Sequence, residues 1–260
     1  MTALAVHSGH LTMRSVRALV RNPAYLLITL VQPVMWLFLF GQLFKNVVDI
    51  PGFGTPGTSY LEFLTPGVVA MTALFSAAWA GTVYIEDMGR GVMDRLLASP
   101  VSRGAMMNAT LLYQSITCIV QTAVVVALAY AAGARFVGGV RGVALMFVAA
   151  VLLTLVFAAL SNAVALLVRQ QEALIGISQL LSLPLSFLSS AMIDTRLSPG
   201  WIQTVARYNP MDWAVVVSRE ALSASPDWGA LWPRLGALAG LALVMGWLAT
   251  RAFTAYQRSS

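Results

Sequence analysis

The sequence predicts an all-α integral membrane protein with six transmembrane helices. Hydrophobic residues make up 58% of its 260 residues and charged residues only 10%, whereas soluble domains are about 25% charged. The chain also contains apolar runs close to the roughly 20 residues that a helix needs to cross a bilayer. These runs do not alternate apolar and polar residues, as the strands of a membrane barrel would.

We expect the membrane spans at 24–44, 63–85, 109–134, 142–168, 173–193 and 235–250 of one transmembrane domain covering residues 1–260. The third and fourth runs are long enough to tilt in the bilayer, and the last is short unless its helix begins near Ala230. The first run follows three arginines, as in a signal peptide. It is too long for one and lacks a small-residue cleavage site, so we expect it to be retained.

The distribution of positive charge predicts that both termini are cytoplasmic. With the N-terminus inside, nine of the sixteen basic residues lie in the cytoplasm and seven outside. The cytoplasmic set is Arg14, Arg17, Arg21, Arg90, Arg95, Arg103, Arg169, Arg251 and Arg258. The margin is narrow, and the prediction relies on the cluster before the first span, which usually dominates orientation.

Residues 1–22 contain a pattern typical of an amphipathic helix lying at the membrane surface. Over 4–21, a helical arrangement places His10, Arg14, Arg17 and Arg21 on one face, opposite apolar residues. Arginines on such a face lie near lipid phosphates. The alternative is a frayed basic N-terminus.

A charged segment at 86–103 separates the second and third apolar runs and holds six of the twenty-six charged residues. In a helix, Val92, Met93, Leu96 and Leu97 share one arc, and Asp87, Arg90, Asp94 and Arg95 share the other. The segment thus predicts a short amphipathic helix parallel to the membrane, ended at Ser99 because the next residue is proline. A solvated loop is the alternative.

The outer segment 194–234 holds four of the seven tryptophans, a residue type that collects at membrane interfaces. We expect two short helices, at 199–207 and 211–222, separated by Asn209-Pro210. They cap or re-enter the outer leaflet in one interpretation and form a surface hairpin in the other.

The predicted spans contain no Asp, Glu, His, Lys or Arg, which disfavours ion-coupled transport and hydrolysis. No acidic residue lies within a span as drawn, Glu62 is at the edge of the second, and both histidines precede the first. Ion-coupled transporters need such groups on their pathway, and hydrolytic sites need a base. The single Cys118 offers no metal or disulfide chemistry.

ATP binding through a P-loop is also excluded, because that motif requires a lysine after its glycines. The one lysine, Lys45, lies in GQLFKN. An ATP-driven process would therefore need a separate ATPase, and the segment 86–103 is the largest predicted cytoplasmic surface on which it could dock. The net charge of +6 is explained by arginines near anionic lipid, and we expect no nucleic-acid partner.

The segment 91–103, GVMDRLLASPVSR, resembles the first cytoplasmic loop of type-2 ABC exporter permeases, the group that includes the daunorubicin and doxorubicin resistance permeases. Val92 and Asp94 replace the usual Thr and Glu, and Met88 stands where a charge is common. A second match precedes the last span, at Pro199, Trp201, Asn209, Pro210 and Arg219.

The resemblance implies a plasma-membrane permease, in a bacterium one of the inner membrane, with an elbow helix, a coupling helix and outer re-entrant helices. It implies two ATP-binding subunits that carry ATP and Mg²⁺, a second permease chain, identical or paralogous, and no cofactor or catalytic residue on this chain. The implied docking residues are Glu86, Asp87, Arg90, Val92, Met93, Asp94, Arg95, Leu96 and Leu97.

Polar residues within the spans are the candidates for a substrate path, although hydrogen bonds between helices are a competing explanation. They are Gln32, Gln114, Gln121, Asn162, Gln179, Ser182 and Ser186. A path of this composition suits an amphipathic drug or lipid. The alternatives are a polysaccharide or lipid-linked glycan exporter of the same family, an ion-coupled secondary transporter and a membrane scaffold.

Overall fold

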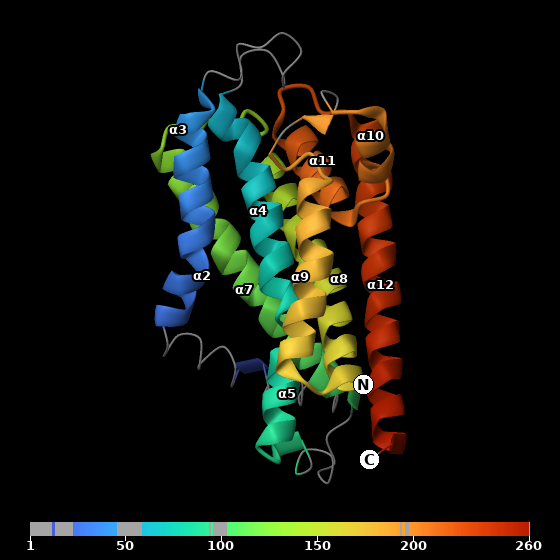
Figure 1. The fold of residues 1–260 in the computed structure, drawn as a ribbon. Helices are drawn as coiled ribbons and strands as arrows, with labels where there is room; N and C mark the ends of the chain where they lie inside the picture. The colour runs from blue at the N-terminus through green and yellow to red at the C-terminus, as the bar shows by residue number, and fades with distance from the viewer. Residues whose placement is uncertain are drawn as a thin grey trace.

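The computed structural model describes residues 12–13, 23–45, 59–93, 95, 103–192, 194–195 and 198–259, and over this part of the chain it contains helices and turns but no strand. The helices, in chain order, are α2 (Pro23–Met35), the π-helix η1 (Trp36–Phe40), α3 (Gly41–Leu43), α4 (Tyr60–Ala78), α5 (Thr82–Gly89), α7 (Arg103–Ala131), α8 (Gly139–Val168), α9 (Gln171–Phe187), α10 (Gly200–Ala206), α11 (Pro210–Leu222) and α12 (Trp228–Ser259). Most run along one common direction (Figure 1).

Four stretches of the described chain are long and apolar enough to cross a membrane: Tyr60–Gly89, Gly104–Ala131, Gly139–Val168 and Trp228–Phe253. The apolar stretch Ile28–Leu43 is shorter, and α9 has 17 residues. The predicted all-helical fold is confirmed over the described residues, with four candidate spans in place of a demonstrated six. The predicted spans at 24–44 and 173–193 coincide with these two shorter helical stretches.

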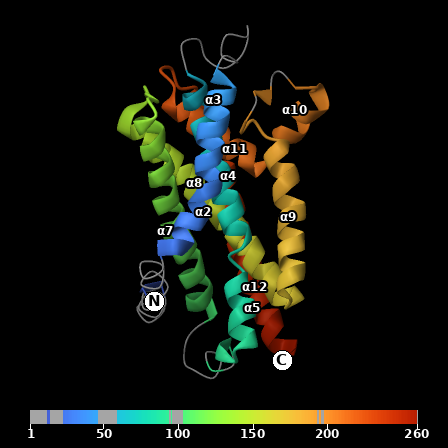
Figure 2. The same cartoon turned by 60° about the vertical axis from the view of Figure 1, so that its left-hand side comes forward.

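Helix α8 is the centre of the bundle and packs against α4, α7, α11 and α12. Its start lies so close to α11 that a Cβ on Gly142 would be 2.2 Å from the carbonyl oxygen of Ala221. Glycine therefore permits backbone contact here, a common means of packing helices in membranes. In Figures 1 and 2, α4 lies between α2 and α9, and α7 passes behind α2.

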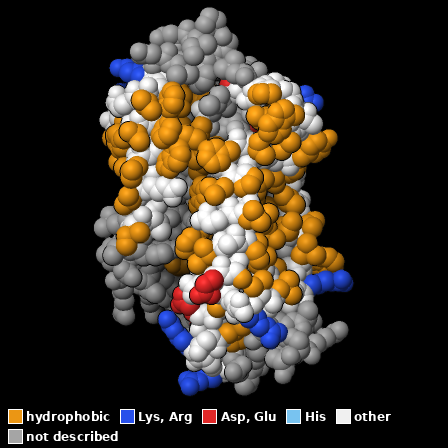
Figure 3. All heavy atoms as spheres, in the orientation of Figure 1, with side chains coloured by type: hydrophobic (Ala, Val, Ile, Leu, Met, Phe, Trp, Pro, Cys, Tyr) orange, Lys and Arg blue, Asp and Glu red, His pale blue; other side chains and the backbone are white. Residues whose placement is uncertain are grey.

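The surface has the polarity of a membrane protein. On the face drawn in Figure 3, hydrophobic side chains cover the middle, and Lys and Arg gather toward the two ends. Large apolar residues are exposed on α2 and α9, including Ile28 at 71% and Leu180 at 73%. Contiguous exposed apolar area of this kind marks a surface that lipid or another protein covers.

The two ends of the bundle carry different elements. The junction of α5 with the following loop and the last turns of α12 lie at one end, and α3, α10 and α11 lie at the other (Figure 1). We call these the α5 end and the α11 end. The two short helices expected before the last span are present as α10 and α11.

Several element boundaries differ from the predicted ones. Helix α12 has 32 residues, so the last span is not short. It contains Pro233 in its second turn, where the missing N–H leaves the carbonyl of Gly229 without its usual intrahelical donor. Helix α7 begins at Arg103, inside the predicted loop, and α5 extends the second span to Gly89.

Candidate functional site

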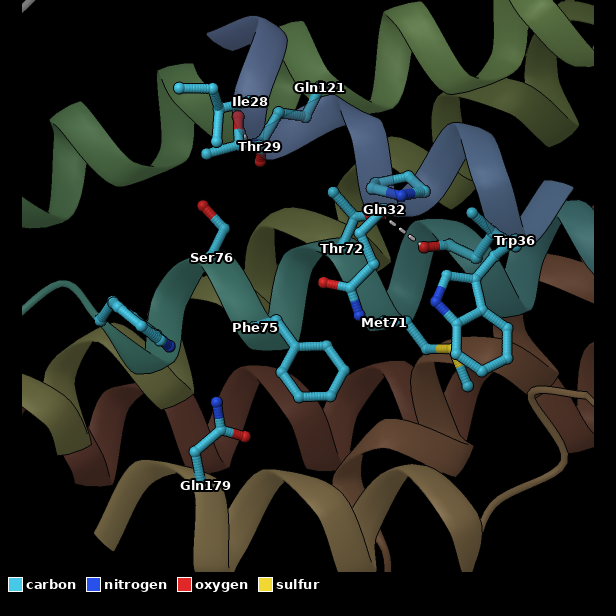
Figure 4. Close-up of a pocket in the computed structure, with 13 residues that line it drawn as sticks. Ile28, Thr29, Gln32, Trp36, Met71, Thr72, Phe75, Ser76, Gln121 and Gln179 are labelled. Carbon is cyan, nitrogen blue, oxygen red and sulfur yellow. Dashed lines mark hydrogen bonds between the residues drawn. The ribbon is translucent and has the colours of Figure 1, made fainter. Parts of the chain in front are cut away.

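A cavity of about 390 Å³ lies between α2, η1, α4, α7 and α9. This volume falls within the roughly 300–1,000 Å³ typical of small-molecule sites. Its lining residues are Ile28, Thr29, Gln32, Pro33, Trp36, Val68, Met71, Thr72, Phe75, Ser76, Trp79, Gln121 and Gln179. Figure 4 shows side chains from several helices converging on it.

Three of the predicted path residues meet at this cavity: Gln32 from α2, Gln121 from α7 and Gln179 from α9 (Figure 4). Gln32 is exposed and Gln179 half-buried, whereas Gln121 is only 1% exposed. The Gln121 Nε2 donates to Thr29 Oγ1 at 3.2 Å. Its Oε1 has no hydrogen-bond partner, as is also true of Oδ1 of the buried Asn162, which does not line this cavity.

Aromatic and aliphatic side chains supply most of the remaining wall. Trp36, Phe75 and Trp79 are the aromatic members, and none of the thirteen lining residues is charged. Trp36 begins the π-helix η1, which follows Pro33. The π-helix widens the turn and stacks Trp36 on Phe40, with ring centroids 4.6 Å apart. Such widened turns are frequent at functional sites.

The other four predicted path residues do not line this cavity. Gln114 and Ser186 are buried at 6% and 5% exposure, and the Ser186 hydroxyl donates to the carbonyl of Ser182 at 2.7 Å. Ser182 lines a separate space of about 20 Å³ beside Ser161 and Ser178. Asn162 belongs to a polar cluster near α5. Three of the seven predicted path residues therefore line this cavity, and four do not.

That polar cluster connects α5 to α7 and α8. The Thr110 hydroxyl donates to the carbonyl of Met107 at 2.8 Å, so toward Tyr84 and Asn162 it acts as the acceptor. Tyr84 Oη lies 3.1 Å from Thr110 Oγ1, and Asn162 Nδ2 donates to the same atom at 3.1 Å. One hydroxyl thus makes three bonds, the full capacity of a threonine. Tyr84 also packs edge-on against Phe253 of α12.

The second predicted span, which lies within the candidate span Tyr60–Gly89, is interrupted between α4 and α5, at 79–81. The carbonyl of Ala78 accepts hydrogen bonds from Ser161 Oγ at 2.7 Å and Ser178 Oγ at 2.8 Å. The Gly81 N–H donates to Ser161 Oγ at 3.0 Å. Backbone groups freed by a broken helix must find partners in a membrane, and the two serines supply them from α8 and α9.

The predicted helix over 86–97 is not continuous. Helix α5 carries Glu86 and Asp87 and ends at Gly89, and Gly91 then adopts φ +65°. This left-handed conformation favours glycine, because a Cβ would clash with the backbone. The helical residues that follow include Val92, Met93 and Arg95. The glycine therefore divides the expected amphipathic helix into two pieces.

The described docking candidates differ in exposure. Glu86, Arg90 and Arg95 are exposed, and Asp87 and Val92 are half-buried. Glu86 and Arg90 form a 3.5 Å ion pair. Met93 is 1% exposed and packs within this chain in a cluster with Tyr84. Its side chain thus faces the interior of the bundle, and its place on the docking face stays a prediction.

Three further docking candidates, Asp94, Leu96 and Leu97, lie outside the described residues. The same holds for most of the predicted elbow helix at 1–22. Thr12 and Met13 are described and helical, and Thr12 Oγ1 donates to the carbonyl of Ala109 at 3.4 Å. Thr12 therefore contacts the first part of α7.

At the α11 end, Asn209 connects two elements. Its Oδ1 accepts from the N–H of Met211 at 2.9 Å and caps α11, in which Pro210 is the first residue. Its Nδ2 donates to the carbonyls of Leu185 and Leu188 at 2.7 and 3.0 Å. The Asn-Pro pair therefore begins one helix and fastens it to the end of another.

Arg219 has a similar role on the next turns of α11. It donates to the carbonyls of Phe63 and Ala191, each at 3.2 Å. Its guanidinium also lies 3.6 Å from the centroid of the Phe63 ring. In contrast, Trp201 on α10 is 62% exposed, and Pro199 caps the start of α10 through its backbone.

Asp212 is a buried polar residue that sequence reasoning did not single out. It is 5% exposed, and its Oδ1 accepts from the N–H of Ser190 at 2.8 Å. Burial raises the pKa of this carboxyl, and the bond from the Ser190 N–H and the nearby arginines oppose that rise. Its place in the first turn of α11, where acidic residues favour the helix dipole, was the available signal.

A membrane-spanning helical bundle with an uncharged cavity, a charged loop and no P-loop defines a class of transport subunit. Residues 8–223 match the ABC-2 type transporter family. The chain belongs to this family, and it is a multi-pass membrane protein.

Its similar proteins include a daunorubicin resistance ABC transporter permease protein of Streptomyces coeruleorubidus, 28% identical over 97% of this chain and 87% of that protein. A putative transport permease of Porphyra purpurea is 29% identical over 80% of this chain and 70% of its own length. A probable doxorubicin resistance ABC transporter permease protein of Mycobacterium tuberculosis is 23% identical over 90% and 83%. The relatives are thus named as permeases.

Proposed function

We propose that this chain is the membrane subunit of an ABC exporter that moves an amphipathic drug, lipid or similar hydrophobic compound out of the cytoplasm. The observation that carries the proposal is the uncharged cavity, in which glutamines from three helices meet aromatic side chains. Two similar proteins are named for resistance to daunorubicin and doxorubicin. Amphipathic compounds need both an apolar wall and a few polar groups.

In this proposal an ATP-binding subunit docks on the loop at 86–103 at the α5 end. Arg90 and Arg95 are exposed there, and Val92, Leu96 and Leu97 complete the proposed surface. Two copies of that subunit carry ATP and Mg²⁺, because this chain has no P-loop lysine. A second permease chain, identical or paralogous, completes the transporter.

The proposed topology has six spans and cytoplasmic termini. The two shorter helical stretches, α2 to α3 and α9, then cross the membrane beside the four longer ones. The α5 end, which includes the last turns of α12, faces the cytoplasm, and the α11 end faces outward with α10 and α11 as re-entrant helices. Residues 1–22 form an elbow helix at the cytoplasmic surface.

The interrupted second span offers a route from the loop to the cavity. Helix α5 leads from the loop, and α4 supplies Met71, Thr72, Phe75 and Ser76 to the cavity wall. Trp79, at the interruption itself, also lines the cavity. Displacement of α5 by the docked subunit would therefore act on the cavity through the junction at 79–81.

The proposal is tested by purifying the tagged full chain from its native membrane and quantifying any co-purifying ATPase. Arg95→Glu is expected to reduce that ATPase severalfold while the permease stays in the membrane. Arg141→Glu is the matched control, because Arg141 is exposed near the start of α8 at the α11 end. Equal retention of an ATPase by both variants would contradict docking on this loop.

Export is tested separately by comparing cells that contain and lack the chain. Cells without it are expected to become more sensitive to some members of a set of uncharged lipophilic aromatic drugs. Equal sensitivity across the whole set would contradict drug export.

A further inference from the structure

One residue that lines the cavity has a side-chain oxygen that makes no hydrogen bond. Gln121 is 1% exposed, and its amide is oriented by the donation from Nε2 to Thr29 Oγ1. The carbonyl oxygen Oε1 has no partner. An unsatisfied buried acceptor is costly, and native proteins satisfy most such groups. Of the five buried side-chain oxygens without a partner in the described part of the chain, Gln121 Oε1 alone belongs to a residue that lines this cavity, and we read it as a sign of a ligand that supplies a donor.

The remaining wall constrains the rest of that ligand. Trp36 and Trp79 lie on the same cavity as Phe75, and aromatic rings favour stacked or edge-on contact with another ring. No lining residue carries a charge that could compensate an ionised ligand. Since a buried charge without a partner is strongly disfavoured, the cavity favours a neutral molecule.

We infer that Gln121 determines specificity by accepting a hydrogen bond from a hydroxyl or N–H group on an uncharged, ring-containing substrate. This inference rests on the proposed transport function and names the substrate chemistry of the same cavity. It distinguishes Gln121 from Gln32, whose side chain is exposed and can bond with solvent or headgroups.

A pair of small probes tests the donor requirement directly. The full chain in lipid nanodiscs is titrated with 2-naphthol and with its methyl ether, after subtraction of binding to empty nanodiscs. The ether keeps the ring and the oxygen but lacks the donor. Wild-type protein is expected to bind 2-naphthol about tenfold more tightly, the effect expected when an otherwise unpaired buried acceptor is satisfied.

Single substitutions test whether Gln121 causes the preference for 2-naphthol over its methyl ether. Gln121→Met keeps the length of the side chain and removes the acceptor, so both probes are expected to bind equally. Gln114→Met is the matched control, because Gln114 is buried on the same helix and does not line the cavity. It should keep the preference. Gln121→Asn, which withdraws the amide by one methylene, is a second variant expected to lose it.

Three results would overturn the inference: equal binding of the two probes to wild-type protein, a preference retained in the folded Gln121 variants, or no saturable binding of either probe. The last is expected if a lipid tail or a second permease chain fills the cavity. Co-purification of the ATPase is independent of these titrations. A failed titration with an intact complex would therefore reject the donor requirement and leave the transport function in place.

Discussion

The α11 end and the α5 end use polar side chains in opposite ways. At the α11 end, Asn209, Asp212 and Arg219 all bond to backbone groups of neighbouring elements. At the α5 end, Glu86 and Arg90 form an exposed pair on one helix. Buried bonds to backbone contribute to stability, whereas exposed ion pairs contribute little. The comparison indicates that the first set holds the fold and the second is available to a partner.

The largest expected effect is at Arg219. Arg219→Met removes the donors to the carbonyls of Phe63 and Ala191, and should lower the free energy of unfolding by about 3 kcal/mol, as for charged hydrogen bonds. Denaturant unfolding of the purified protein measures it. Arg207→Met, at an exposed arginine of the same end, is the control, and equal losses in both would break the comparison.

Substitution of Asn209 should destabilise the protein less than substitution of Arg219, and two variants can separate the contribution of the helix cap from that of the bonds to Leu185 and Leu188. Asn209→Ala removes the cap of α11 and both bonds to Leu185 and Leu188, and is expected to cost about 2 kcal/mol. Asn209→Ser keeps an oxygen for the cap and loses the amide donor without adding a charge, so it should cost about half as much. The same unfolding measurement applies. No difference between the two variants would contradict separate roles for cap and clamp.

Between the ends, the junction at 79–81 should depend on its serines. Ser178→Ala removes one of the two donors to the Ala78 carbonyl, for an expected loss of about 1 kcal/mol. Ser76→Ala, a half-buried serine of α4, serves as control in the same unfolding assay. A Ser178 variant as stable as the control would show that Ser161 alone satisfies the junction.

The smallest effect on stability is expected at the α5 end. Arg90→Ala breaks a pair whose arginine side chain is 72% exposed, so the unfolding free energy should change by less than about 0.5 kcal/mol. The amount of co-purified ATPase should nevertheless fall. A large loss of stability would show that Arg90 stabilises the fold, as the polar residues of the α11 end do. The two ends would then not differ in the way proposed.

The helices were largely predictable, because their apolar runs are long and the chain has few charges. The Asn-Pro pair also predicted the division between α10 and α11, since both residues have strong positional preferences at a helix start. Capping explains Glu62 too: its carboxylate accepts from the N–H of Ser59, and Ser59 Oγ accepts from the N–H of Glu62. It is thus a helix-start residue at the edge of a span.

The site was predictable only in part. Polar residues in apolar runs identified Gln32, Gln121 and Gln179, but their meeting depends on the rotation and packing of separate helices. Trp36, Phe75 and Trp79 were missed because an aromatic residue in a span has the same local pattern whether it faces lipid or a cavity. The inward position of Met93 follows from the positive φ of Gly91, which the pattern of apolar residues does not encode.

Photocrosslinking from the α5 end is the most direct test of ATPase docking. A photoreactive amino acid is placed at Arg95, or at Arg141 as control, in cells that express the full chain, and crosslinked proteins are identified by mass spectrometry. The account predicts a crosslink from position 95, absent from 141, to a protein with a P-loop. Failure to capture any ATP-binding protein from position 95, or equal capture from both positions, would contradict it.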